Sequence, residues 1–205
     1  MMAVNYAIHA DVIDISSDIP SRSNKFLVDS NIWYWLTYSQ ASHGVEPWRQ
    51  PLISTYPKYV NEALAAGSKL FYCGLSLAEL AHLIEKTEHD IFNATLKPKD
   101  FRHNYPQARS NVLAEVQASW GQVKSLAKSL RFKIDQKTSN SALVRFHQVS
   151  IDGYDLFLLE AMFRQKMLNI LTDDGDFATV PGIQVFTANR NVINAARNQG
   201  KLIIR

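Results

Sequence analysis

The sequence is poor in cysteine and in long apolar segments, and each shortage excludes a class of protein. Its 205 residues include one cysteine, Cys73, so no disulfide can form within the chain, which is typical of a reducing cytosol. The apolar runs are too short and too interrupted to span a bilayer. The first residues carry several aspartates and lack the basic start and apolar stretch of a signal peptide. We therefore expect a cytoplasmic protein with no membrane partner.

Histidine motifs are also missing. The six histidines show no His-Glu-x-x-His pattern and no clustered spacing. Glu79-x-x-His82 is half of a di-iron helix pattern, but the sequence has no second copy. A catalytic or metal site based on histidine is therefore not predicted.

Positive charge is unevenly distributed, although the net charge is only +3. Between Lys97 and Lys137, nine basic residues face three acids. Such asymmetry indicates a surface that meets a polyanion; the alternative is an ordinary solvated helix face.

Hydrophobic patterning predicts strands that alternate with helices after an N-terminal extension at 1–24 that lacks periodicity. Residues 25–205 are expected to form one domain. Strands are predicted at 26–28, 69–73, 169–171, 184–186 and 202–204. Helices are predicted at 30–38, 58–66, 76–85, 106–131, 152–166 and 191–198. This order predicts an α/β fold with a central, mostly parallel sheet covered on both faces, that is, a three-layer α/β/α architecture.

Four acidic residues each follow or open a strand-to-helix unit: Asp29, Glu79, Asp155 and Asp174. In an open α/β sheet such positions gather beyond the carboxyl ends of the strands. Four neighbouring carboxylates cannot all stay ionised without a cation. Oxygen ligands without thiolates or a histidine pair suit Mg²⁺ or Mn²⁺.

Each acid also has a purely structural interpretation. Asp29 can cap a helix, Asp174-Gly175 is a turn dipeptide, and Glu79 can complete a capping box with Ser76. Asp152 can cap the helix that contains Asp155. Because Ser, Thr and Asn cap helices as well, four caps need not all be acidic. The joint pattern therefore favours a metal site.

Over roughly 25–190 the motifs resemble the PIN domain family. They are FLVDSN at 26–31, SLAEL at 76–80, Asp155 at a helix start, and NILTDDGDF at 169–177. The resemblance implies a metal-dependent ribonuclease that hydrolyses RNA, such as the toxin of a type II toxin–antitoxin pair. The stretch between the second and third acidic motifs is longer than in the small toxins, so additional helices are expected there.

The resemblance also implies roles for individual residues. Asp29, Glu79, Asp155 and Asp174 would be the catalytic metal ligands, with Asp173 as the alternative to Asp174 in the alignment. Asp176 would be an outer or second-metal carboxylate. Substrate contacts would come from Ser30, Asn31 and Thr172, whose hydroxyl would also position the turn.

The expected partners follow from the basic residues of the sequence and from the resemblance to the PIN domain. On the predicted helix at 106–131, Lys124, Lys128 and Arg131 form one stripe that would contact RNA phosphates without reading sequence. A homodimer and a small antitoxin protein are implied by the resemblance alone.

Two other functions compete with this interpretation. A phosphatase of the haloacid dehalogenase type also begins with a strand and Asp, but needs a second Asp where this chain has Asn31. A catalytically silent PIN-like RNA-binding or assembly module is the alternative from a different class.

Overall fold

The structure is a computed structural model that describes residues 4–205. Its centre is one seven-stranded parallel sheet with the strand order β4-β3-β2-β5-β6-β1-β7. The strands are β1 (Asp11–Asp14), β2 (Lys25–Val28), β3 (Lys69–Tyr72), β4 (Lys128–Ser129), β5 (Asn169–Leu171), β6 (Gln184–Thr187) and β7 (Leu202–Ile203).

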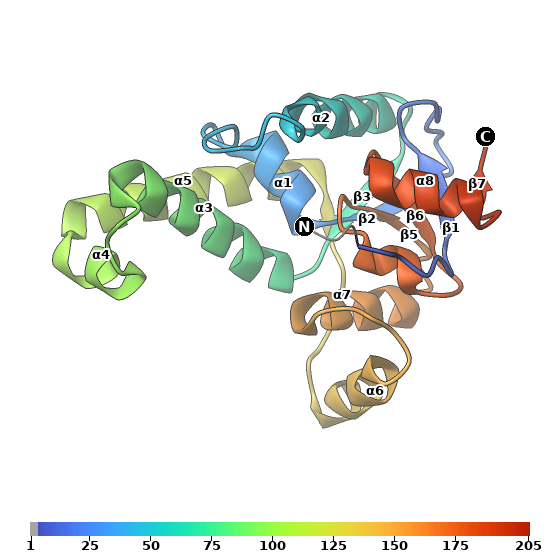
Figure 1. Cartoon of the computed structure of the whole chain (residues 1–205). Helices are drawn as coiled ribbons and strands as arrows, with labels where there is room; N and C mark the ends of the chain where they lie inside the picture. The colour runs from blue at the N-terminus through green and yellow to red at the C-terminus, as the bar shows by residue number, and fades with distance from the viewer. Residues whose placement is uncertain (1–3) are drawn as a thin grey trace.

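Eight α-helices and one 3-10 helix, η1, surround the sheet within residues 4–205. They are α1 (Ser30–Thr37), α2 (Gln50–Ala65), α3 (Leu75–Asn93), α4 (Pro98–Asn104), α5 (Pro106–Leu126), α6 (Gln136–Phe146), α7 (Gly153–Arg164), η1 (Asp176–Thr179) and α8 (Arg190–Asn198). The ends of α3 and α5 that meet α4 project beside the sheet (Figure 1). No helix in the described part of the chain combines the length and apolarity that a bilayer crossing requires.

Alternation along the strands separates two buried faces. Phe26 and Val28 pack with α1 and α2 in one apolar cluster, whereas Leu27 packs with α7 in another. Val12 joins α8 in a third cluster. The predicted three-layer α/β/α fold is confirmed. The additional helices between Glu79 and Asp155 are α4, α5 and α6, which also agrees with the prediction.

The prediction of a free N-terminal extension at 1–24 is wrong where the structure describes it. Strand β1 lies inside the sheet, hydrogen-bonded to β6 on one side and β7 on the other. Val12 and Ile13 are almost completely buried. A four-residue strand with aspartates at both ends is too short to show periodicity.

The long helix predicted at 106–131 ends earlier than expected. Helix α5 stops at Leu126, and Ala127 adopts an extended backbone with φ −136° and ψ 163°. Lys128 then lies in the edge strand β4, and Arg131 lies in an irregular segment. Of the predicted basic stripe, only Lys124 is therefore helical.

The placement of β1 can be tested with two matched substitutions in the N-terminal segment. Ile13 is 1% exposed and Ile19 is 82% exposed. We expect Ile13→Ala to lower the free energy of unfolding by about 2–5 kcal/mol, because it leaves a cavity in the core. Ile19→Ala should change it by less than about 0.5 kcal/mol. Urea unfolding measures both, and equal, negligible effects would mean that this segment does not belong to the sheet.

Candidate metal centre

The site lies where three neighbouring strands end. Strand β2 is hydrogen-bonded to β3 on one side and β5 on the other. The chain leaves β2 at Asp29, leaves β3 toward the helix with Glu79, and leaves β5 toward Asp174. Neighbouring parallel strands with diverging connections form the crevice in which open α/β sheets bind ligands.

Asp29 both caps a helix and faces the site. Its backbone is extended, and one carboxylate oxygen accepts a 2.6 Å hydrogen bond from the Ser30 amide at the start of α1. The other oxygen accepts a 2.7 Å hydrogen bond from the Thr172 hydroxyl. The side-chain bonds hold the carboxylate in one orientation, so the capping interpretation and the site interpretation are compatible.

Glu79 does not form the capping box that its spacing with Ser76 allows. Its Oε2 atom instead accepts a 2.5 Å hydrogen bond from the Ser30 hydroxyl, 49 residues away in the sequence. The Ser76 hydroxyl accepts a hydrogen bond from the Cys73 amide. Glu79 is thereby tied to the start of α1 rather than to its own helix.

Asp155 enters the site from the first turn of α7. Asp152 is the N-cap of this helix and accepts hydrogen bonds from the amides of Tyr154 and Asp155, as predicted. Asp155 is 6% exposed, and within residues 4–205 no donor reaches its carboxylate. Because Asp155 is mostly buried, a nearby cation or a proton on its carboxyl would be favourable.

The three carboxylates converge. Oxygen atoms of Asp29, Glu79 and Asp155 all lie within 4.8 Å of one another, which is compatible with binding one cation. Asp174 lines the same pocket of about 580 Å³, together with Ser30 and Asn31. All four predicted ligands thus border one space, with Asp174 outside the tight trio.

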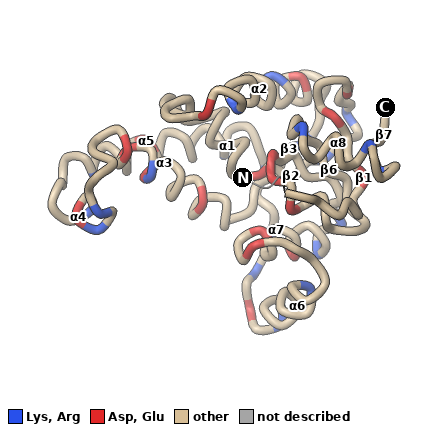
Figure 2. Tube along the Cα trace, viewed as in Figure 1, with Lys and Arg blue, Asp and Glu red and all other residues tan. Residues whose placement is uncertain are grey.

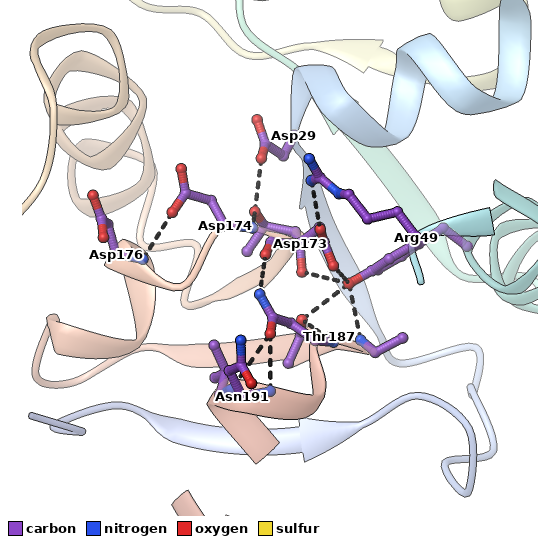
Figure 3. Close-up of polar contacts among 12 residues, drawn as sticks. Asp29, Arg49, Asp173, Asp174, Asp176, Thr187 and Asn191 are labelled. Atoms are coloured by element: carbon purple, nitrogen blue, oxygen red, sulfur yellow. Dashed lines mark hydrogen bonds and ion pairs between the residues drawn. The ribbon is translucent and has the colours of Figure 1, made fainter. Parts of the chain in front are cut away.

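Asp174 and Asp173 face different parts of the molecule (Figure 3). The Asp174 amide donates to the Thr172 hydroxyl at 2.8 Å, and its Oδ1 accepts from the Asp176 amide at 2.8 Å. Asp173 instead binds Arg49 and Tyr56. This geometry favours Asp174 over Asp173 as the ligand, and Asp176 lies beside Asp174.

The electrostatics of the site follow from burial and crowding. Burial, followed by the charges of Glu79 and Asp174, raises the pKa of Asp29 to about 7, against the lowering effect of its hydrogen bonds. Burial, followed by the charge of Asp29, raises the pKa of Asp155 to about 10. Burial also raises the pKa of Glu79. A divalent cation would offset this repulsion, so the donor set fits Mg²⁺ or Mn²⁺.

The predicted basic contacts lie elsewhere. Lys124, Lys128 and Arg131 are exposed but are not among the described residues that line the pocket. Among the described lysines and arginines, Arg109 lines the pocket, near the start of α5. Figure 2 shows Lys and Arg scattered over several elements rather than gathered in one stripe. Thr172 is fully buried and bridges Asp29 and Asp174 instead of facing the pocket.

The N-terminal segment also reaches the site, which the sequence did not indicate. The Tyr6 ring lies against Gly175 so closely that a Cβ there would be 2.3 Å from the ring Cζ. The carbonyl of Tyr6 accepts a hydrogen bond from Gln199 beyond α8. Glycine at 175 therefore allows the segment to pack on the turn that carries Asp174.

No known family model matches the chain, and no curated protein or solved structure matches it.

We expect Asp155→Asn to stabilise the metal-free protein at pH 8. The pKa of Asp155 in the folded protein lies above its value of about 3.9 in the unfolded chain. Between these two pKa values the folded protein becomes less stable as pH rises, because the unfolded chain releases the proton more readily. The variant removes this loss, so its advantage should grow from pH 4 to pH 8. A gain of about 1 kcal/mol would raise Tm by about 2–4 °C.

Thermal melts in EDTA and in Mn²⁺ measure both sides of this expectation. Mn²⁺ should raise the Tm of the wild type more than that of Asp155→Asn. Asp100→Asn, which changes an exposed acid on α4, is the control and should behave as the wild type. A variant that is less stable than the wild type in EDTA at pH 8 would show that the Asp155 carboxylate is well satisfied without metal.

Proposed function

We propose that the protein is a Mg²⁺- or Mn²⁺-dependent ribonuclease that hydrolyses RNA phosphodiester bonds. The observation that carries the proposal is the convergence of Asp29, Glu79 and Asp155 within 4.8 Å, at the edge of the pocket that Asp174 also lines. The same motifs at the same positions carry the resemblance to the PIN domain. By that resemblance, the further partners proposed are a second copy of the chain and a small antitoxin protein.

The proposed chemistry divides between the cation and the chain. When bound, the cation would lower the pKa of a water molecule and act as a Lewis acid on a phosphate oxygen. Asp29, Glu79 and Asp155 would hold it, with Asp174 close by. A carboxylate that does not bind the cation, such as Asp176, would accept the proton of the attacking water. The amino ends of α1 and α7 both face this space, and their dipoles favour anionic groups.

The pocket itself suits a nucleotide. Apolar side chains of Leu83, Val112 and Val116 line it beyond the acids, and Tyr154 borders it with 54% of its surface exposed. A planar base could pack on such a surface while its phosphate meets the cation. Arg109, whose Nη1 is 3.6 Å from Glu85, would supply positive charge for a neighbouring phosphate.

Labelled RNAs test the activity directly. We expect the wild type to cleave RNA in Mn²⁺ and not in EDTA. Asp29→Asn and Asp174→Asn should each lose at least about 100-fold in rate, since even residues that only support a metal ligand cost 10–100-fold. Asp100→Asn is the control and should cleave as the wild type does. Binding without cleavage in Mg²⁺ and Mn²⁺ would refute the enzyme and leave the RNA-binding or assembly module.

Two basic residues on the same helix identify the phosphate contact. Arg109 lines the pocket, whereas Lys124 lies 15 positions further along α5, about 22 Å away at 1.5 Å per residue. We expect Arg109→Ala to weaken RNA binding and to reduce the slope of log affinity against log salt by about one, because one phosphate contact is lost. Lys124→Ala should change neither. The reverse result in salt titrations would favour the basic stripe predicted from the sequence.

A further inference from the structure

Asp173, the residue before Asp174, is held by contacts on the side of the turn that faces away from the pocket. Asp173 is 5% exposed, and its two carboxylate oxygens accept from different groups: Oδ2 from Arg49 Nη2 at 3.0 Å and Oδ1 from the Tyr56 hydroxyl at 2.9 Å. Its backbone carbonyl accepts a 2.8 Å hydrogen bond from the Asn189 side chain. The main chain and the side chain of one turn residue are therefore both fixed (Figure 3).

These anchors belong to rigid parts of the fold. Tyr56, on α2, is fully buried, and its hydroxyl also lies 3.0 Å from the Thr187 hydroxyl at the end of β6. The same hydroxyl accepts a 2.9 Å hydrogen bond from the Ala188 amide. Asn189 is the N-cap of α8 as well. The turn after β5 is thus tied to α2, β6 and α8.

Arg49 is the third anchor and lies in the turn directly before α2, at the N-cap position of that helix. Among the described residues, it is the only Lys or Arg that forms an ion pair with any acid of the site or its turn. Its guanidinium lies 5.9 Å from the ring centre of Trp35 and 5.4 Å from that of Trp48. Within residues 4–205 no acceptor reaches the buried Arg49 Nε atom, and the group is held by its contacts with the two aromatic rings and with Asp173.

We propose that Arg49 is a positioning residue: its ion pair with Asp173 sets the direction of the Asp174 carboxylate and thereby the affinity of the site for a divalent cation. This inference rests on the proposed metal-dependent function. Asp173 and Asp174 are consecutive in a tight turn, so a rotation that moves one side chain moves the other. On the pocket side the turn is held by hydrogen bonds to Thr172 and Asp176. Arg49 holds it from the other side.

Loss of Arg49 would leave the Asp173 carboxylate buried next to Asp174 without the positive charge of the guanidinium. An uncompensated buried carboxylate is costly, so the turn would rearrange to bring Asp173 toward water. A displacement on the order of 1 Å is enough to disturb a metal site whose supporting contacts have been removed. Tyr56 and Asn189 would still hold the turn in the fold, so the variant should lose affinity for the cation rather than its structure.

Calorimetric titration with Mn²⁺ alone tests the inference without an RNA substrate. We expect Arg49→Ala to raise the Kd for Mn²⁺ by about 10–100-fold, as for other residues that orient a ligand. Asp173→Asn should have a smaller effect in the same direction. In the double variant the two effects should not add, because the two residues act through one contact. Arg49→Lys should recover only part of the affinity, since lysine keeps the charge but lacks the planar fork.

Arg145→Ala is the matched control. Arg145, on α6, pairs with the buried Glu160 of α7 at 2.6 Å and lies 4.3 Å from the Phe163 ring centre, and it forms no ion pair with Asp173. It should lower Tm and leave the Mn²⁺ affinity unchanged. Wild-type affinity in Arg49→Ala and Arg49→Lys, or an equal loss in Arg145→Ala, would overturn the positioning role alone. A wild type that binds no Mn²⁺ would overturn the proposed function together with this inference.

Discussion

Repulsion among buried carboxylates is the constraint on which the site depends. Burial and then the neighbouring carboxylates raise the pKa of Asp29, where Glu79 contributes, and of Asp155, where Asp29 contributes. A chain that needed these residues only as helix caps would not have to bring them together. The fold tolerates the crowding through donors to Asp29 and Glu79 and through two helix amino ends that favour anions. Among the residues that the structure describes, none donates a hydrogen bond to the Asp155 carboxylate, and the proposed cation would supply positive charge there.

The sheet topology creates this crowding. Because β2 lies between β3 and β5, the chain leaves three adjacent strands toward the same edge. The segments that follow these strands carry Asp29, Glu79 and Asp174. Asp155 comes from α7, which packs on the face of the sheet that contains Leu27. Helices α3 and α5 line the pocket beyond the acids with apolar side chains and Arg109. The same pocket is therefore lined by carboxylates in one part and by apolar side chains in another.

The parts of the site that local patterns reveal could be predicted from the sequence. Apolar runs that end in an acid located β2 and β5, and the spacing of Asp152 and Asp155 located a capped helix. Pairings across long sequence distances could not be predicted, because Arg49 and Asp173 are 124 residues apart and Arg49 stands in no motif. Strand β1 was missed since its four residues show no periodicity. The end of α5 was missed because Ala127 and Leu130 continue the helical pattern after the backbone has become extended.

Anomalous diffraction from crystals soaked in Mn²⁺ would show whether these carboxylates bind a divalent cation. We expect an anomalous peak between Asp29, Glu79 and Asp155, with metal–oxygen distances on the order of 2 Å. The Asp174 carboxylate should face the ion, and Asp173 should keep its ion pair with Arg49. A soaked crystal without a peak at this position, or with Mn²⁺ bound only elsewhere, would mean that the carboxylates do not form a metal site.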